Sequence, residues 1–87
     1  MLNKDMFGNY RFYVRGDEEN LKKFTIELTW FHSALAEIGS VGEDSIKRGL
    51  YTLNLIVKDP EREDYLRKLA KEFNVIGFAS FKEIENC

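Results

Sequence analysis

Few residues of this chain are of the types that commonly carry out chemistry. It has one histidine, His32, and one cysteine, Cys87, which is the last residue. A zinc site needs several histidine or cysteine ligands, and a histidine base needs an orienting partner that the sequence does not identify. No nucleophile-elbow pattern surrounds any of the serines, which are Ser33, Ser40, Ser45 and Ser80. The sequence therefore predicts no catalytic residue, no metal ligand and no cofactor.

Two acidic clusters have the composition of a metal site or of an acid–base pair. One is Asp17-Glu18-Glu19, and the other comprises Glu61, Glu63 and Asp64. Both stand where a helix is expected to begin, and the helix dipole favours acidic residues at that end. We therefore interpret both clusters as helix starts, and a non-enzymatic function is favoured over an enzymatic one.

Length and charge narrow the class of protein further. The chain has 87 residues, 44% of them hydrophobic, with a formal net charge of −2. This length and composition predict one domain over 1–87 with a hydrophobic core, in which 1–9 and 85–87 are loose. The small negative net charge gives no overall electrostatic attraction to nucleic acid or to anionic membranes. No apolar run approaches the roughly 18 residues of a membrane span, and the first nine residues do not resemble a signal peptide. We expect a cytoplasmic protein that does not contact a membrane.

The first half of the chain predicts a strand and a long helix. Tyr10, Phe12 and Val14 alternate with other residues over 10–15, as in a half-buried strand. Asp17 is a suitable N-cap for a helix over 18–38. In that range six apolar residues recur at spacings of three and four, namely Leu21, Phe24, Leu28, Phe31, Leu35 and Ile38. Gly39 is expected to end the helix, and a strand over 24–30 is the alternative interpretation.

The second half predicts three more strands and a second helix. A polar stretch over 40–48 holds a weak edge strand near Ile46, and 50–58 is the strongest strand of the chain. Asp59-Pro60 is typical of a helix start. A strand over 75–84 follows the second helix, whose apolar stripe is Leu66, Leu69 and Phe73.

This order of elements predicts the fold class. Each helix must bury its apolar stripe, and one sheet provides the surface for both. Right-handed connections then give an α+β fold, a ferredoxin-like βαββαβ sandwich with two helices on one face of a mostly antiparallel sheet.

A second apolar face on the long helix is the first candidate binding site. Ile26, Trp30 and Ala34 are spaced by four, and Trp30 lies roughly 130° from the predicted core stripe. Tryptophan is enriched at interface hot spots, so this face predicts contact with another protein chain. The alternative is that the N-terminal segment with Met6 and Phe7 folds over it.

The open face of the sheet is the second candidate site. It is expected to combine aromatic and basic side chains, as a platform for single-stranded nucleic acid does. Residues 12–16 resemble the shorter aromatic motif of the RNA-recognition-motif family, whereas 47–51 depart from the longer motif because Leu50 replaces an aromatic residue. Under this interpretation the binding residues are Arg11, Tyr13, Arg15, Lys58, Phe78 and Lys82.

Three functions follow from these surfaces. The preferred hypothesis is a small non-enzymatic regulatory module that acts by protein–protein contact, either as a homo-oligomer or as an inhibitor covering a partner. The alternatives are single-stranded nucleic-acid binding through the sheet and a small-ligand sensor analogous to amino-acid-binding regulatory domains.

Overall fold

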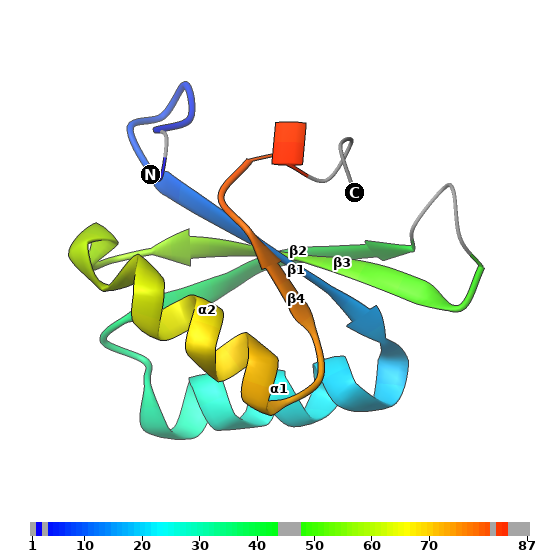
Figure 1. Ribbon diagram of the computed structural model, residues 1–87. Helices are drawn as coiled ribbons and strands as arrows, with labels where there is room; N and C mark the ends of the chain where they lie inside the picture. Colours follow the sequence, from blue (N-terminus) through cyan, green and yellow to red (C-terminus); the bar gives the residue numbers. More distant parts are fainter. Residues whose placement is uncertain (1, 3, 44–47, 81, 84–87) are drawn as a thin grey trace.

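A computed structural model describes residues 2, 4–43, 48–80 and 82–83 of the chain. Within these residues four strands form one sheet. Figure 1 shows that α1 and α2 lie on a single face of it. The strands are antiparallel, in the order β2-β3-β1-β4. The elements are β1 (Tyr10–Asp17), α1 (Glu18–Phe31), β2 (Ala36–Glu43), β3 (Leu50–Val57), the 3-10 turn η1 (Pro60–Arg62), α2 (Glu63–Glu72) and β4 (Ile76–Phe78). The predicted ferredoxin-like α+β fold is confirmed.

The two central strands form the core layer that the alternation predicts. Phe12 and Val14 of β1 are fully buried, and their cross-strand partners in β3 are Leu55 and Leu53. Paired residues of neighbouring strands point to the same face. These two strands therefore present one apolar surface to both helices.

Helix α1 begins as predicted and ends earlier. The Asp17 carboxylate accepts the N–H of Asn20 at 2.8 Å, which is the expected N-cap bond. Leu21, Phe24 and Leu28 are buried against the sheet, so the strand interpretation of 24–30 is wrong. The helix ends at Phe31, and not at residue 38. The N–H of His32 makes the last helical bond, to the Leu28 carbonyl, and the His32 carbonyl then accepts the N–H of Leu35 in a turn.

The predicted end of α1 is in fact the second strand. Leu35 is buried in the connecting turn, and Ile38 belongs to β2. Gly39 does not stop a helix. It lies at a β-bulge, where an added Cβ would sit 2.9 Å from the carbonyl oxygen of Asn54. The weak strand expected near Ile46 falls outside the described residues.

Helix α2 follows the prediction, and β4 is shorter than expected. Leu66, Leu69 and Ala70 are buried, although the Asp59 side chain makes no capping bond. The sequence predicts a strand over 75–84, but β4 has only three residues. The chain bends after them, and the N–H of Ala79 donates to the carboxylate of Glu83 at 3.3 Å.

Arg67 of α2 links the helix to β4 and to Glu83 through side-chain hydrogen bonds. Its Nε donates to Glu63 at 2.9 Å, and its Nη2 donates to Glu83 at 3.1 Å. Its Nη1 donates to the carbonyl of Gly77 in β4 at 3.3 Å. Partial burial lowers the pKa of this guanidinium, but the two carboxylates outweigh burial and the pKa is raised.

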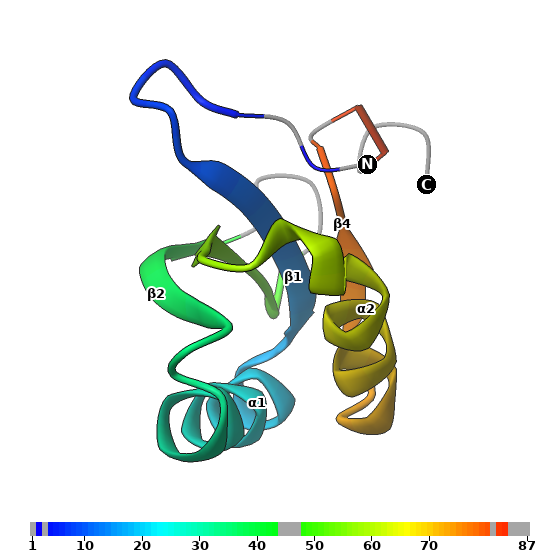
Figure 2. The same cartoon turned by 90° about the vertical axis from the view of Figure 1, so that its left-hand side faces the viewer.

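The N-terminal segment forms a hydrogen-bonded turn on the far side of the sheet from the helices (Figure 2). The Asp5 carboxylate accepts the N–H groups of Phe7 and Asn9 at 2.8 and 2.9 Å. Its other oxygen accepts the Nε–H of Arg11 at 2.7 Å. Met6 and Phe7 are exposed at the tip, so they do not cover the outer face of α1.

Candidate protein-binding site

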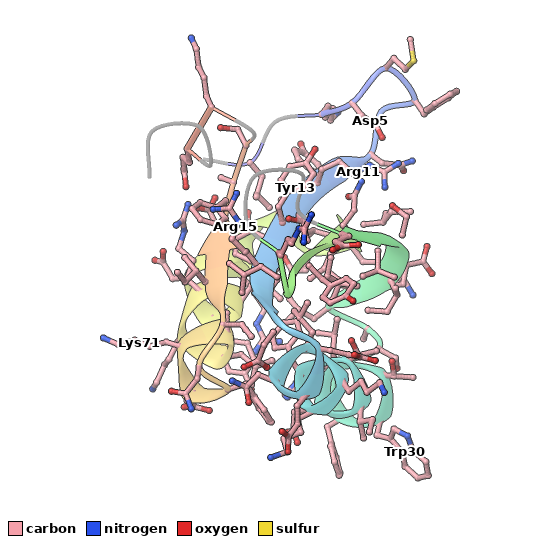
Figure 3. The ribbon with its side chains drawn as sticks, turned by 90° about the vertical axis from the view of Figure 1, so that its right-hand side faces the viewer. Asp5, Arg11, Tyr13, Arg15, Trp30 and Lys71 are labelled. Carbon is pink, nitrogen blue, oxygen red and sulfur yellow. The ribbon has the colours of Figure 1, made fainter. Side chains whose placement is uncertain are left out.

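The outer face of α1 exposes two of the apolar side chains that the sequence places there. Ile26 is 58% exposed and Trp30 is 76% exposed. They lie one helical turn apart, which puts them side by side. In Figure 3 Trp30 projects from the body of the protein, away from the sheet.

The end of α1 departs from the prediction at two positions. Ala34 is exposed in the turn after the helix, so it does not continue the face of Ile26 and Trp30. Phe31, which the spacing assigns to the core, is 71% exposed because the helix ends there. His32 is half-buried instead, with its ring 5.3 Å from that of Tyr65.

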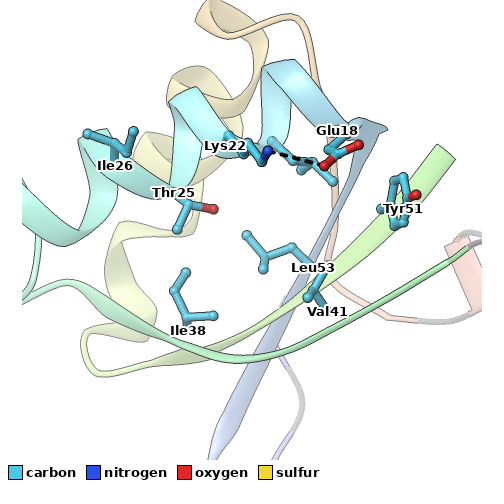
Figure 4. Close-up of a pocket in the computed structure, with 9 residues that line it drawn as sticks. Glu18, Lys22, Thr25, Ile26, Ile38, Val41, Tyr51 and Leu53 are labelled. Carbon is cyan, nitrogen blue, oxygen red and sulfur yellow. Dashed lines mark ion pairs between the residues drawn. The ribbon is translucent and has the colours of Figure 1, made fainter. Parts of the chain in front are cut away.

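An apolar groove runs beside this exposed helix face, between α1 and β2 (Figure 4). Its volume is about 440 Å³. In Figure 4 Thr25 of the helix points toward Ile38 of the strand across the opening, and Ile26 lies beside Thr25 on the helix. The lining is Leu21, Thr25 and Ile26 from α1, Ile38 and Val41 from β2, Tyr51 and Leu53 from β3, and the Glu18–Lys22 pair.

The bulge in β2 gives the groove its strand wall. The bulge shifts the register between Ile38 and Ser40, so that Ile38 is opposite Leu55 and Val41 is opposite Leu53. Ile38 and Val41 therefore both face α1, although they are three residues apart. Val41 is 62% exposed. We call Ile26, Trp30, Ile38 and Val41 the α1–β2 surface. Sequence reasoning missed its β2 half.

Carboxylates border the α1–β2 surface. Glu18 and Lys22 form an exposed ion pair of 3.1 Å at one end of the groove. In β2 Glu37 and Glu43 stand on either side of Ile38 and Val41. The Nζ of Lys58 lies 3.8 Å from Glu37, and both side chains are about half exposed. Glu43 is opposite Tyr51 of the groove lining, so it lies on the groove's face of the sheet, whereas Glu37 is opposite Ile56 and lies on the other face. β2 therefore carries a carboxylate near each end, and the one at Glu37 is paired with Lys58.

The open face of the sheet carries Arg11, Tyr13 and Arg15 in a row, as predicted (Figure 3). Asp5 meets Arg11 in an ion pair of 2.7 Å, which neutralises one of the three residues. Partial burial raises the pKa of Tyr13, and Asp5 raises it further while Arg11 lowers it. The row is therefore partly covered and partly neutralised.

The other three residues of the predicted nucleic-acid platform do not extend this row. Phe78 is opposite Tyr13 in the register, but only 3% of it is exposed, and the Arg15 guanidinium lies 5.7 Å from its ring. Lys58 lies beyond the end of β3, where its Nζ donates to the Ser33 carbonyl at 3.1 Å. Lys82 follows the bend after β4.

Groups that could support catalysis are sparse in the described part of the chain. Within it, no three histidine, cysteine, aspartate or glutamate side chains are placed to hold a metal ion. Nε2 of His32 lies 3.5 Å from Glu27 and 3.5 Å from the Tyr65 hydroxyl. His32 is half-buried in the turn that follows α1. Cys87 lies outside the described residues.

Neither helix in the described ranges is long and apolar enough to cross a membrane. Comparison with protein-family models, curated proteins and solved structures gives no significant match. The site must therefore be interpreted from its own geometry and charge.

Proposed function

We propose that this protein acts without catalysis, by binding another protein through the α1–β2 surface. The observation that carries the proposal is the exposure of Ile26, Trp30 and Val41 around an apolar groove. Contiguous apolar patches of this kind mark interaction sites on soluble domains, and tryptophan is among the residues that dominate binding energy.

The position of these side chains also supports binding. They belong to a helix and a strand that share one hydrophobic core, so their backbone is already ordered before a partner arrives. Binding to an ordered surface loses less conformational entropy than binding to a flexible loop. Little of the binding free energy is therefore lost to ordering the backbone of this site.

The alternative functions have less support from the geometry. A nucleic-acid platform needs exposed rings and free cations, whereas Phe78 is buried and Arg11 is paired with Asp5. The groove has the volume of a small-molecule site, but ligand pockets usually add convergent polar groups that fix orientation. The groove is lined by the polar groups of Thr25, Tyr51 and the Glu18–Lys22 pair, and the last two are already paired with each other.

Capture of a partner from an extract of the source cell, with matched variants, tests this proposal. Ile26→Ser changes the α1–β2 surface. Ile76→Ser is the control, because Ile76 is also 58% exposed but lies on β4. We expect Ile26→Ser to weaken binding of the captured, purified partner by about tenfold or more, and Ile76→Ser to leave it unchanged. Equal affinities of the wild type and Ile26→Ser would contradict the proposal.

A further inference from the structure

We infer that the partner supplies an extended segment that adds to the outer edge of β2 as a further strand, with an apolar centre and a basic residue at each end. This inference rests on the proposed function. It names the class of partner and the way the partner is held.

The first step concerns the edge of the sheet. β2 is the outermost strand, and among the described residues it pairs only with β3. It is eight residues long and exposed from Glu37 to Glu43. Beyond the bulge, residues 40–43 return to regular pairing with β3. An edge strand of this kind presents a row of backbone donors and acceptors that an extended peptide can pair with.

The second step concerns the side chains that an added strand would bring. A new strand would lie about 4.8 Å beyond β2, and its alternate side chains would point to the face that carries the helices. On that face Ile38 and Val41 are adjacent in the groove wall, with Ile26 across the opening. Apolar side chains at the centre of the segment would therefore cover the exposed parts of these residues.

The third step concerns charge. β2 contains two glutamates, Glu37 and Glu43, and neither lysine nor arginine. Lys58, just after β3, lies 3.8 Å from Glu37, but both side chains are about half exposed, so solvent weakens this pair and a closer basic group can compete for Glu37. Pairing β2 with the β2 of a second copy would bring four carboxylates to one edge, and like charges on neighbouring strands are destabilising. Lysine or arginine at both ends of a different segment would be attracted instead. The acidic ends of β2 thus favour a basic partner over self-association.

A peptide of eight residues, the length of β2, is the probe for this inference. It has lysine at both ends, valine at alternate positions between them and threonine at the rest. A second peptide carries glutamate in place of both lysines. A third repeats the first with alternate backbone nitrogens methylated, which removes donors that a strand needs. Calorimetry gives the affinities, and amide hydrogen exchange locates the bound peptide.

We expect the lysine peptide to bind and to slow amide exchange over residues 40–43. The glutamate peptide and the methylated peptide should each bind about tenfold more weakly or worse. The variant Glu37→Lys with Glu43→Lys should reverse the preference between the lysine and glutamate peptides. Val41→Thr keeps a strand-forming residue and should weaken binding, whereas Ile76→Thr on the other edge should not.

Two results would overturn the inference. One is equal affinity for all three peptides, or no saturation of the lysine peptide by about 1 mM. The other is a doubled molar mass in solution that Val41→Thr abolishes, because the occupant of the edge would then be a second copy. Either result leaves the proposed function standing if Ile26→Ser still loses the captured partner. If Ile26→Ser binds that partner as the wild type does, the proposed function itself fails.

Discussion

Alanine substitutions at Phe24 and Trp30 compare the two sides of α1. Phe24 is fully buried, and its ring meets that of Phe73 edge to face at a centroid distance of 6.2 Å. Trp30 lies on the outer side of the same helix and is 76% exposed. If Trp30 belongs to a binding surface, its removal should cost little folding free energy.

The two variants are expected to differ widely in stability. Removing a buried phenylalanine costs about 3–5 kcal/mol. A chain of this length has a total stability of about 4–13 kcal/mol, so Phe24→Ala should lower the melting temperature by at least about 12 °C or prevent folding. An exposed substitution stays within about 0.5 kcal/mol, which is less than about 4 °C here.

Urea unfolding followed by circular dichroism is the suitable assay for both variants. Fluorescence is unsuitable because Trp30 is the only tryptophan. A loss of about 2 kcal/mol or more for Trp30→Ala would refute the reasoning, because the side chain would then be part of the core. A loss below about 1 kcal/mol for Phe24→Ala would show that the core is placed wrongly.

Three further predictions concern the fold around the site. In Gly77→Ala the added Cβ would lie 2.5 Å from the ring of Phe12. The free energy of unfolding should therefore fall by about 1–3 kcal/mol, and an unchanged urea midpoint would contradict this packing. Arg67→Met removes the partly exposed ion pairs with Glu63 and Glu83. Because solvent screens these pairs, the free energy of unfolding should fall by about 1 kcal/mol or less, and a fall above about 3 kcal/mol in urea unfolding would contradict this. The N–H of Asn9, followed by the guanidinium of Arg11, lowers the pKa of Asp5 below its ordinary 3.8. The ionised carboxylate should therefore stabilise the turn fully above pH 3.8, and this stabilisation should be lost as the pH falls through the lower pKa of the folded state. An NMR titration midpoint of Asp5 at or above 3.8 would contradict this.

The elements with a clear period could be predicted from the sequence. Alternation in β1 and β3 predicts which side chains face the helices, and Asp17 predicts the start of α1. The end of α1 could not be predicted, because Leu35 and Ile38 continue the helical spacing. Leu35 is buried in a turn, whereas Ile38 belongs to β2 and is 36% exposed. Near the end of α1 the apolar spacing therefore reports neither the element that carries a residue nor, at Phe31 and Ile38, whether the side chain is covered.

Only the α1 half of the candidate site could be predicted from the sequence, because only that half shows a clear period. Ile26 and Trp30 stand apart from the core stripe of a helix, so their exposure follows from the helical period. Val41 has glycine and serine as neighbours and shows no period of its own. Its position facing α1 depends on the bulge after Ile38, which only the pairing with β3 reveals. A groove between two elements can be predicted only when the positions of the two elements relative to each other are known.

Site-specific photo-cross-linking tests most directly whether the α1–β2 surface binds a partner. Ile26 is replaced by benzoylphenylalanine in one sample, and the equally exposed Ile76 is replaced in a second. Both samples are irradiated in an extract of the source cell. Binding through this surface predicts a discrete cross-linked protein from position 26 and none from position 76. A cross-link of the same protein from position 76 alone, or equally from both positions, would contradict it.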